Sequence, residues 1–152
     1  MNLTKYLLIL CMLIATGCCS ASKNNSSPVG KDAHQDSIYA VGVVFGSICC
    51  GTASDEFLKE FISAYNNKNS IEINADIAAG CGREGEFVIL INIPENKKTI
   101  SAAFITELEK IVLERDAKNK QSNSSSGGIE VIKDRKKSDY LHCRLGIKKW
   151  LM

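Results

Sequence analysis

The hydrophobic and polar positions divide the chain into three parts. Residues 6–15 form an unbroken apolar run behind a single lysine, Lys5. Residues 19–37 are dominated by Ser, Asn, Lys, Gly and Pro and show no apolar period, which is typical of a flexible spacer. From residue 38 onward apolar side chains return at the spacings of strands and helices. The folded domain is therefore predicted to begin there.

The first half of this domain reads as strand, helix, strand. Residues 38–45 (IYAVGVVF) are continuously apolar and rich in β-branched side chains, as in a strand buried on both faces. A helix is predicted to start at Thr52 or Ser54 and to end at residues 66–69. Residues 71–77 alternate apolar and polar side chains, which predicts a half-exposed strand at a sheet edge. The apolar stripe of the helix consists of Phe57, Leu58, Phe61, Ile62 and Tyr65.

The second half of the domain reads in the same order. Residues 87–93 (FVILINI) predict a second buried strand. A helix is predicted to start at Thr99 or Ser101 and to end before the low-complexity loop 121–128 (QSNSSSGG). Residues 129–132 can form one more short strand. The apolar stripe of this helix consists of Phe104, Ile105, Leu108, Ile111 and Val112.

The order strand, helix, strand, strand, helix, strand predicts an α+β domain over residues 38–133. It fits the ferredoxin-like split βαβ arrangement (βαββαβ), an antiparallel sheet with two helices on one face. Residues 134–152 are expected to form a basic C-terminal extension. Because polar and apolar side chains alternate from Tyr140 to Leu145, a second possibility stays open, namely that this segment is the final strand of the sheet.

Length and charge exclude several classes of protein. A chain of 152 residues with 45% hydrophobic residues is sufficient for one globular domain. A formal net charge of +2 is too small to indicate a nucleic acid as partner. Basic residues gather in residues 129–152, where a solvated surface is the first interpretation and binding of anionic lipid is another.

The first twenty residues predict a lipid anchor. The apolar run is about half the roughly 20 residues that a membrane-spanning helix requires, so it reads as a signal peptide. It ends in Ala15-Thr16-Gly17-Cys18, which resembles the lipobox of bacterial lipoproteins. That resemblance implies cleavage after Gly17, a diacylglycerol on the Cys18 thiol and an acyl chain such as palmitate on the new N-terminus. The alternatives are an uncleaved buried helix, an ordinary secretory signal and a lipid on Cys19.

The resemblance implies a location but no activity. It places residues 18–37 as a lipidated tether and the domain at the surface of a bacterial membrane in the cell envelope. Two or more acyl chains hold a protein stably on a bilayer. No Asp follows Cys18, which by resemblance to the sorting rule of enteric bacteria favours the outer membrane. The expected partners are the membrane itself and an unidentified envelope protein.

Seven cysteines indicate disulfides in an exported protein. In the ferredoxin-like arrangement the loop after the first strand and the hairpin after the second lie at the same end of the sheet. Cys49, Cys50 and Cys81 are therefore expected to approach one another. Three interpretations stay open: a disulfide of Cys81 with Cys49 or Cys50, a soft-metal site for copper(I) or zinc, and inert packing.

A second candidate site is the polar loop 82–86 (GREGE), in which Arg83, Glu84 and Glu86 form a candidate recognition loop. No Ser, His and Asp arrangement stands out, and neighbours on a strand such as His142 and Cys143 rarely bind one metal. The sequence therefore predicts a binding or scaffolding module without catalysis and without a cofactor. The alternative is a thiol protein that handles a soft metal or a redox partner through Cys49, Cys50 and Cys81.

Overall fold

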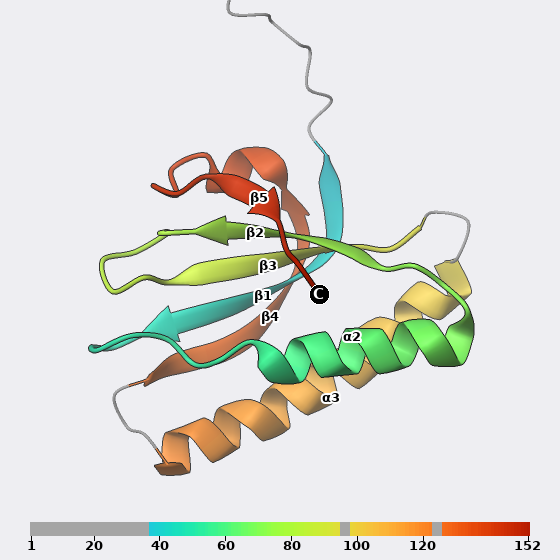
Figure 1. Cartoon of the computed structure of the whole chain (residues 1–152), viewed down its shortest axis with the longest axis horizontal. Helices are drawn as coiled ribbons and strands as arrows, with labels where there is room; N and C mark the ends of the chain where they lie inside the picture. The colour runs from blue at the N-terminus through green and yellow to red at the C-terminus, as the bar shows by residue number, and fades with distance from the viewer. Residues whose placement is uncertain (1–36, 95–97, 123–125) are drawn as a thin grey trace, which may run out of the picture. The chain divides into compact units, whose positions relative to one another are not determined.

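The computed structural model describes residues 37–94, 98–122 and 126–152 (Figure 1). The predicted signal peptide, Cys18 and almost all of the predicted tether lie outside the described residues. In the ranges that are described, no helix is both long enough and apolar enough to pass through a membrane.

The described strands form one five-stranded antiparallel sheet, and two α-helices accompany it. The order across the sheet is β4-β1-β3-β2-β5. The predicted α+β class is confirmed, but the sheet departs from the predicted four-strand pattern because a fifth strand lies beside β2. In chain order the elements are β1 (Ile38–Ser47), α2 (Glu56–Asn69), β2 (Asn74–Ala79), β3 (Phe87–Asn92), α3 (Lys98–Ser122), β4 (Ser126–Lys136), the 3-10 helix η2 (Lys137–Tyr140) and β5 (Ile147–Lys149).

The register of the central strands fixes which loops share an end of the sheet. Phe87 at the start of β3 lies opposite Phe45 on one side and opposite Ala79 on the other. The turn after β1 and the hairpin between β2 and β3 therefore lie at the same end, as predicted.

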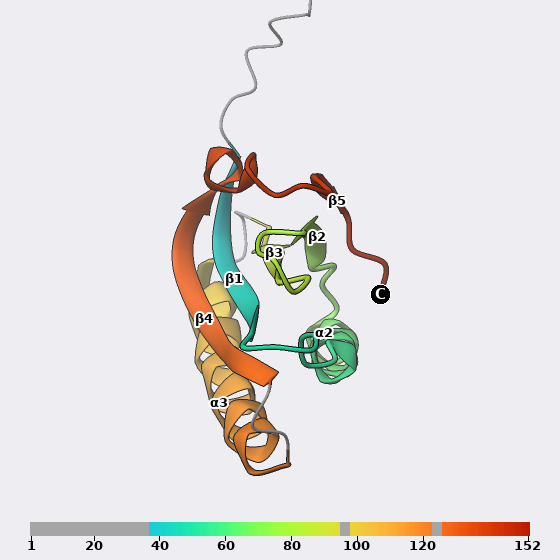
Figure 2. The ribbon, with the colours of Figure 1, turned by 90° about the vertical axis from the view of Figure 1, so that its left-hand side faces the viewer.

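The main apolar core lies between the sheet and the helices, which both cover one face (Figure 2). Each helix turns its predicted apolar stripe toward the strands, because side chains three and four residues apart share a helix face. Burying one large apolar side chain contributes about 1.5–3 kcal/mol, so these stripes hold the helices in place. The fully buried members are Leu58 and Ile62 on α2 and Phe104 and Leu108 on α3.

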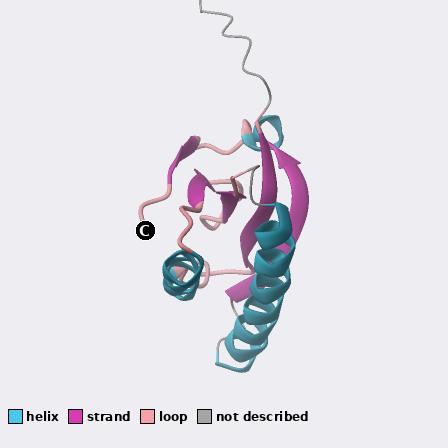
Figure 3. Ribbon diagram, turned by 90° about the vertical axis from the view of Figure 1, so that its right-hand side faces the viewer, coloured by secondary structure: helices cyan, strands magenta, loops and turns pink. Residues whose placement is uncertain are grey.

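The opposite side of the sheet, here called the helix-free face, carries a second apolar cluster. Residues 137–146, here called the crossover, pass over this face from the β4 edge to the β5 edge (Figure 3). The backbone N–H of Lys137 donates to the Ser37 carbonyl at 3.0 Å, which holds the start of the crossover beside the start of β1. The buried members of the cluster are Tyr39, Ala78, Val88, Leu90, Tyr140 and Cys143.

A polar link ties three strands together on this face. The Tyr39 hydroxyl on β1 donates to Asp76 Oδ2 on β2 at 2.7 Å, and Lys149 Nζ on β5 lies 2.9 Å from Asp76 Oδ1. Burial, followed by the hydrogen bond to Asp76, raises the pKa of Tyr39 above its usual range. The phenol therefore stays protonated and keeps donating above the pH at which an exposed tyrosine ionises.

Two predictions about the first half of the domain were wrong. The strand expected over 71–77 runs from Asn74 to Ala79 and is no edge strand, because β5 pairs with it. The first helix starts at Glu56 with Asp55 rather than Thr52 or Ser54 at the N-cap position, although the Ser54 hydroxyl accepts the Glu56 N–H at 3.3 Å. The Asp55 carboxylate does not cap the helix and instead accepts a hydrogen bond from Trp150 Nε1 at 2.7 Å.

The predicted boundary at residue 133 was also wrong. β4 is eleven residues long and continues to Lys136, whereas only 129–132 was predicted. It starts inside the predicted loop 121–128, where Gly127 packs so closely that a Cβ there would lie 2.2 Å from the Gly46 carbonyl carbon. The helix before it likewise extends into that loop, to Ser122.

The C-terminal residues belong to the domain rather than to an extension. The possible final strand from Tyr140 to Leu145 does not form, because these residues are the end of η2 and two turns. Tyr140 and Cys143 are both buried, and their spacing of three suits the tight turns of this segment. Beyond β5, Trp150 is buried in the main core, and its backbone N–H donates to the Ala75 carbonyl at 3.0 Å.

Candidate functional site

A disulfide joins the β2–β3 hairpin to the crossover. Cys81 and Cys143 are bonded with an S–S distance of 2.08 Å across a sequence separation of 62 residues. Closing a loop of this length restricts the unfolded chain and contributes about 4 kcal/mol in the loop-entropy description. The expectation that Cys81 pairs with Cys49 or Cys50 was therefore wrong in its partner, although Cys81 does form a disulfide.

The other two cysteines lie at the same end of the sheet but outside this bond. Cys49 and Cys50 are exposed in the turn after β1. From this turn the chain runs to α2 on the helix-covered face, whereas Cys81 packs against the apolar cluster of the helix-free face. Among the described residues, no group of three His, Cys, Asp or Glu side chains is placed to hold a metal ion. The proposed soft-metal ligand set of Cys49, Cys50 and Cys81 is thus not assembled.

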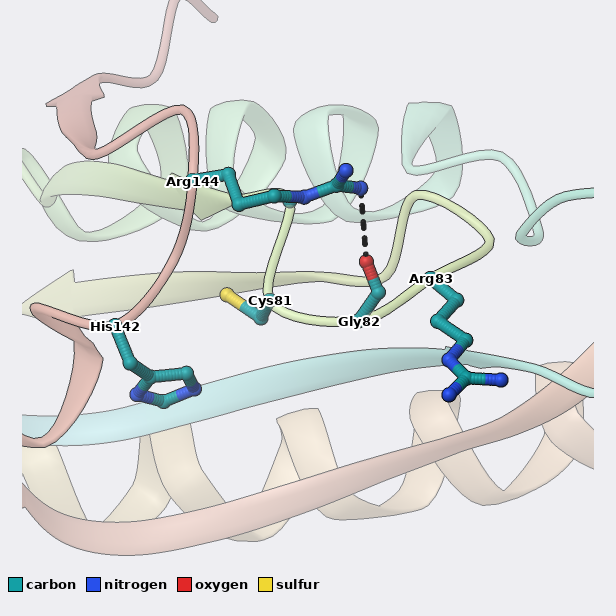
Figure 4. A pocket seen from close by; sticks show the side chains of 6 residues that line it. Cys81, Gly82, Arg83, His142 and Arg144 are labelled. Carbon is teal, nitrogen blue, oxygen red and sulfur yellow. Dashed lines mark hydrogen bonds between the residues drawn. The ribbon is translucent and has the colours of Figure 1, made fainter.

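Beside the disulfide lies an open hollow of about 380 Å³ (Figure 4). The β2–β3 hairpin forms one wall and the crossover forms the other. Its lining residues are Gly80, Cys81, Gly82, Arg83, His142 and Arg144. Three of these six can carry positive charge, and they come from segments about sixty residues apart in the chain.

Backbone hydrogen bonds hold the two walls together. The Arg144 N–H donates to the Gly80 carbonyl at 3.1 Å, and the Leu145 N–H donates to the Ala79 carbonyl at 3.0 Å. The Arg144 guanidinium also donates from Nη2 to the Gly82 carbonyl at 3.1 Å, the bond drawn in Figure 4. With the disulfide, these bonds make the spacing of the walls a fixed feature of the fold.

The predicted recognition loop is divided between two roles. The Glu86 carboxylate folds back over the loop and accepts the Glu84 N–H at 2.9 Å. A Cβ on residue 82 would meet that carboxylate, so a larger residue there would require the Glu86 side chain to move. Arg83 instead lines the hollow. Glu86 therefore shapes the loop, while Arg83 is the side chain that the loop presents.

The basic side chains of the hollow take no part in the ion pairs of the described residues. None of the ion pairs among the described residues involves Arg83, His142 or Arg144. The His142 ring lies against the disulfide, with 3.9 Å between Nε2 and Cys143 Sγ. Figure 4 shows Arg83 and His142 on the same side of the sheet, in front of β1. Such an arrangement can accept an anion, because guanidinium groups bind carboxylate and phosphate through paired hydrogen bonds.

Only part of this site was predicted from the sequence. Arg83 and Cys81 were predicted as candidate site residues, whereas His142 and Cys143 were expected to be neighbours on a strand and Arg144 to belong to the basic tail. The cluster of basic residues after residue 129 was the available signal. That signal cannot show which of the basic residues face a loop located sixty residues earlier.

No family model matches the chain, and no curated protein or solved structure matches it either. The observations that bear on its function are therefore the lipobox resemblance and the chemistry of this hollow.

Proposed function

We propose that this chain is a lipid-anchored envelope protein whose α+β domain binds an anionic partner group in the hollow beside the Cys81–Cys143 disulfide. The lipobox resemblance at residues 15–18 supports the anchor. The observation that carries the binding role is the meeting of Arg83, His142 and Arg144 in one hollow without a paired carboxylate among the described residues.

The arrangement assigns different tasks to the two arginines. The Arg144 guanidinium donates one N–H to the Gly82 carbonyl, so its side chain is oriented before any ligand binds. Arg83 is exposed and has all five of its N–H donors available for a ligand. A carboxylate or phosphate group would therefore meet one fixed and one adjustable guanidinium.

We further propose that the domain is a ferredoxin-like split βαβ unit with one added strand. The order β4-β1-β3-β2 with α2 and α3 on one face supports this assignment. In this description β5 is an addition to the β2 edge, and the crossover that carries His142 and Arg144 is the means by which the chain reaches that edge.

Anion binding is tested by phosphorus NMR of inorganic phosphate with the detergent-solubilised full chain. Wild type is expected to broaden the phosphate signal at millimolar concentration. A hydrogen bond to a charged group is worth about 1.5–3 kcal/mol, so Arg83→Gln is expected to weaken binding by roughly tenfold or more. The matched control is Lys110→Gln, an exposed cation on α3. Equal phosphate binding by both variants would contradict the assignment of the hollow.

The anchor is tested by intact-protein mass spectrometry of the membrane fraction, with and without reduction and alkylation. The expected mass lacks residues 1–17 and carries acyl chains. An unlipidated mass that retains Met1 would refute the anchor. The alkylation count also addresses the thiol alternative: the binding module predicts Cys81 and Cys143 protected until reduction, and ready labelling of Cys81 in the native protein would favour a redox role.

A further inference from the structure

The crossover lies where the chain enters the folded domain. The hydrogen bond from Lys137 to Ser37 places the first residue of the crossover beside the start of β1. Figures 1, 2 and 3 all show η2 next to the start of β1, with both helices on the far side of the sheet. We propose that the crossover is a membrane-docking surface that lies against anionic lipid headgroups. This inference rests on the proposed lipid anchor and names phosphate of the bilayer surface as the anion of the hollow.

The chain length between the anchor and the domain permits this contact. If Cys18 carries the lipid, nineteen peptide steps separate it from Ser37, and they span at most about 65 Å when fully extended. The tether thus holds the domain within about 65 Å of the bilayer. The charge and hydrophobicity of each surface then decide which one contacts the lipid. The surface nearest to Ser37 is the crossover.

The charge of this region suits an anionic bilayer. Residues 135–149 contain six basic residues and one acidic residue, Asp139. The helices α2 and α3 together hold seven basic and six acidic residues, so the opposite side of the domain is nearly neutral. Each Lys or Arg close to an anionic leaflet raises the affinity of the protein for that leaflet by about fivefold. The six basic residues are Arg135, Lys136, Lys137, Arg144, Lys148 and Lys149, of which Lys149 is paired with Asp76.

The crossover also presents apolar side chains. Leu141 is 74% exposed and Leu145 is 61% exposed. They stand two residues before and two residues after Cys143, whose disulfide fixes the segment to the sheet. Exposed leucines beside lysine and arginine are the combination by which peripheral segments enter the interfacial zone of a bilayer. The leucines supply burial in lipid, and Arg83, His142 and Arg144 supply the contacts with headgroup phosphate.

The test uses the lipidated full chain on vesicles of neutral phosphatidylcholine and on vesicles that also contain phosphatidylglycerol. Hydrogen exchange of the crossover is followed by mass spectrometry on both. We expect exchange in residues 137–146 to slow by about fivefold or more on the anionic vesicles. The protection is expected to disappear in high salt and in the double variant Leu141→Asp/Leu145→Asp. Leu113→Asp, at a site on α3 that is 71% exposed, is the matched control and is expected to keep the protection.

The outcomes separate the anchor from the docking surface. Flotation with neutral vesicles depends on the lipid alone, so a chain that fails to float there lacks the anchor. A chain that floats on both vesicles but exchanges equally fast in its crossover would keep the anchor and overturn the docking surface. If inorganic phosphate slows exchange on neutral vesicles while anionic lipid does not, the hollow binds a soluble anion and the membrane assignment is again overturned.

Discussion

The two faces of the sheet are covered by different kinds of element. The helix-covered face is closed by two long helices whose buried stripes run through one continuous apolar core. The helix-free face is covered by the crossover, which is held by the Cys81–Cys143 disulfide, the buried Tyr140 side chain and a few hydrogen bonds. Local stability follows the density of buried contacts. We therefore expect the first face to contribute most of the stability of the fold, and the second face, which carries the candidate site, to loosen first.

The largest expected effect lies on the helix-covered face. Phe104 is fully buried, and its ring centre lies 5.0 Å from that of Tyr65 and 5.3 Å from that of Phe61. Phe104→Ala is expected to lower the free energy of unfolding by about 3–5 kcal/mol, because it leaves a cavity in a close-packed core. Urea denaturation followed by circular dichroism measures it. The control Leu113→Ala, exposed on the same helix, is expected to cost less than about 0.5 kcal/mol. A Phe104 variant that loosens only the crossover would contradict the comparison.

A smaller and local effect is expected on the helix-free face. The double variant Cys81→Ala/Cys143→Ala is expected to lower the free energy of unfolding by about 2–4 kcal/mol. Hydrogen exchange is expected to rise first in residues 137–146, whereas α2 and α3 keep their protection. Cys50→Ala, at an exposed position, is the control and is expected to leave both measurements unchanged. Uniform loss of protection across the helices would show that the two faces are not independent.

The smallest effect concerns Tyr39 and depends on pH. Tyr39→Phe removes the hydroxyl that donates to Asp76 and is expected to cost about 1 kcal/mol at neutral pH. Burial and the Asp76 hydrogen bond raise the pKa of Tyr39 in the folded protein. The folded state therefore holds the phenol proton more tightly than the unfolded state, whose tyrosines ionise near about pH 10.

The stabilising contribution of Tyr39 is complete below about pH 10 and is lost as the pH rises toward the higher pKa of the folded protein. Denaturation at a series of alkaline pH values is expected to show a shallower decline for Tyr39→Phe than for wild type. The decline does not vanish, because burial also raises the pKa of Tyr65 and Tyr140. Parallel curves for the two proteins would refute this account of the Tyr39 hydroxyl.

The same division separates what was predictable from what was not. The helical stripes around Leu58 and Phe104 were predicted because helix periodicity is a local property. β5 was missed because its three residues, Ile147–Lys149, carry no apolar alternation and owe their conformation to pairing with β2. Trp150 gave no signal of its own, since its partners Asp55 and Ala75 are distant in the chain.

The residue types of the candidate site were predictable from the sequence, but their spatial arrangement was not. The cysteine count and the predicted signal peptide indicate a disulfide, but connectivity cannot be deduced from sequence. The choice of Cys143 over Cys49 or Cys50 as the partner of Cys81 depends on which face each loop reaches after leaving its strand. The same path brings His142 and Arg144 to Arg83.

By itself, then, the sequence determined the α+β class, the two amphipathic helices, the buried strands and the expectation of a lipid anchor at Cys18, because each of these depends on residues close together in the chain. Only the tertiary structure decided the fifth strand, the disulfide partner and the basic hollow. These depend on how the chain crosses the helix-free face, and that path is set by packing and pairing between residues that are far apart in the sequence.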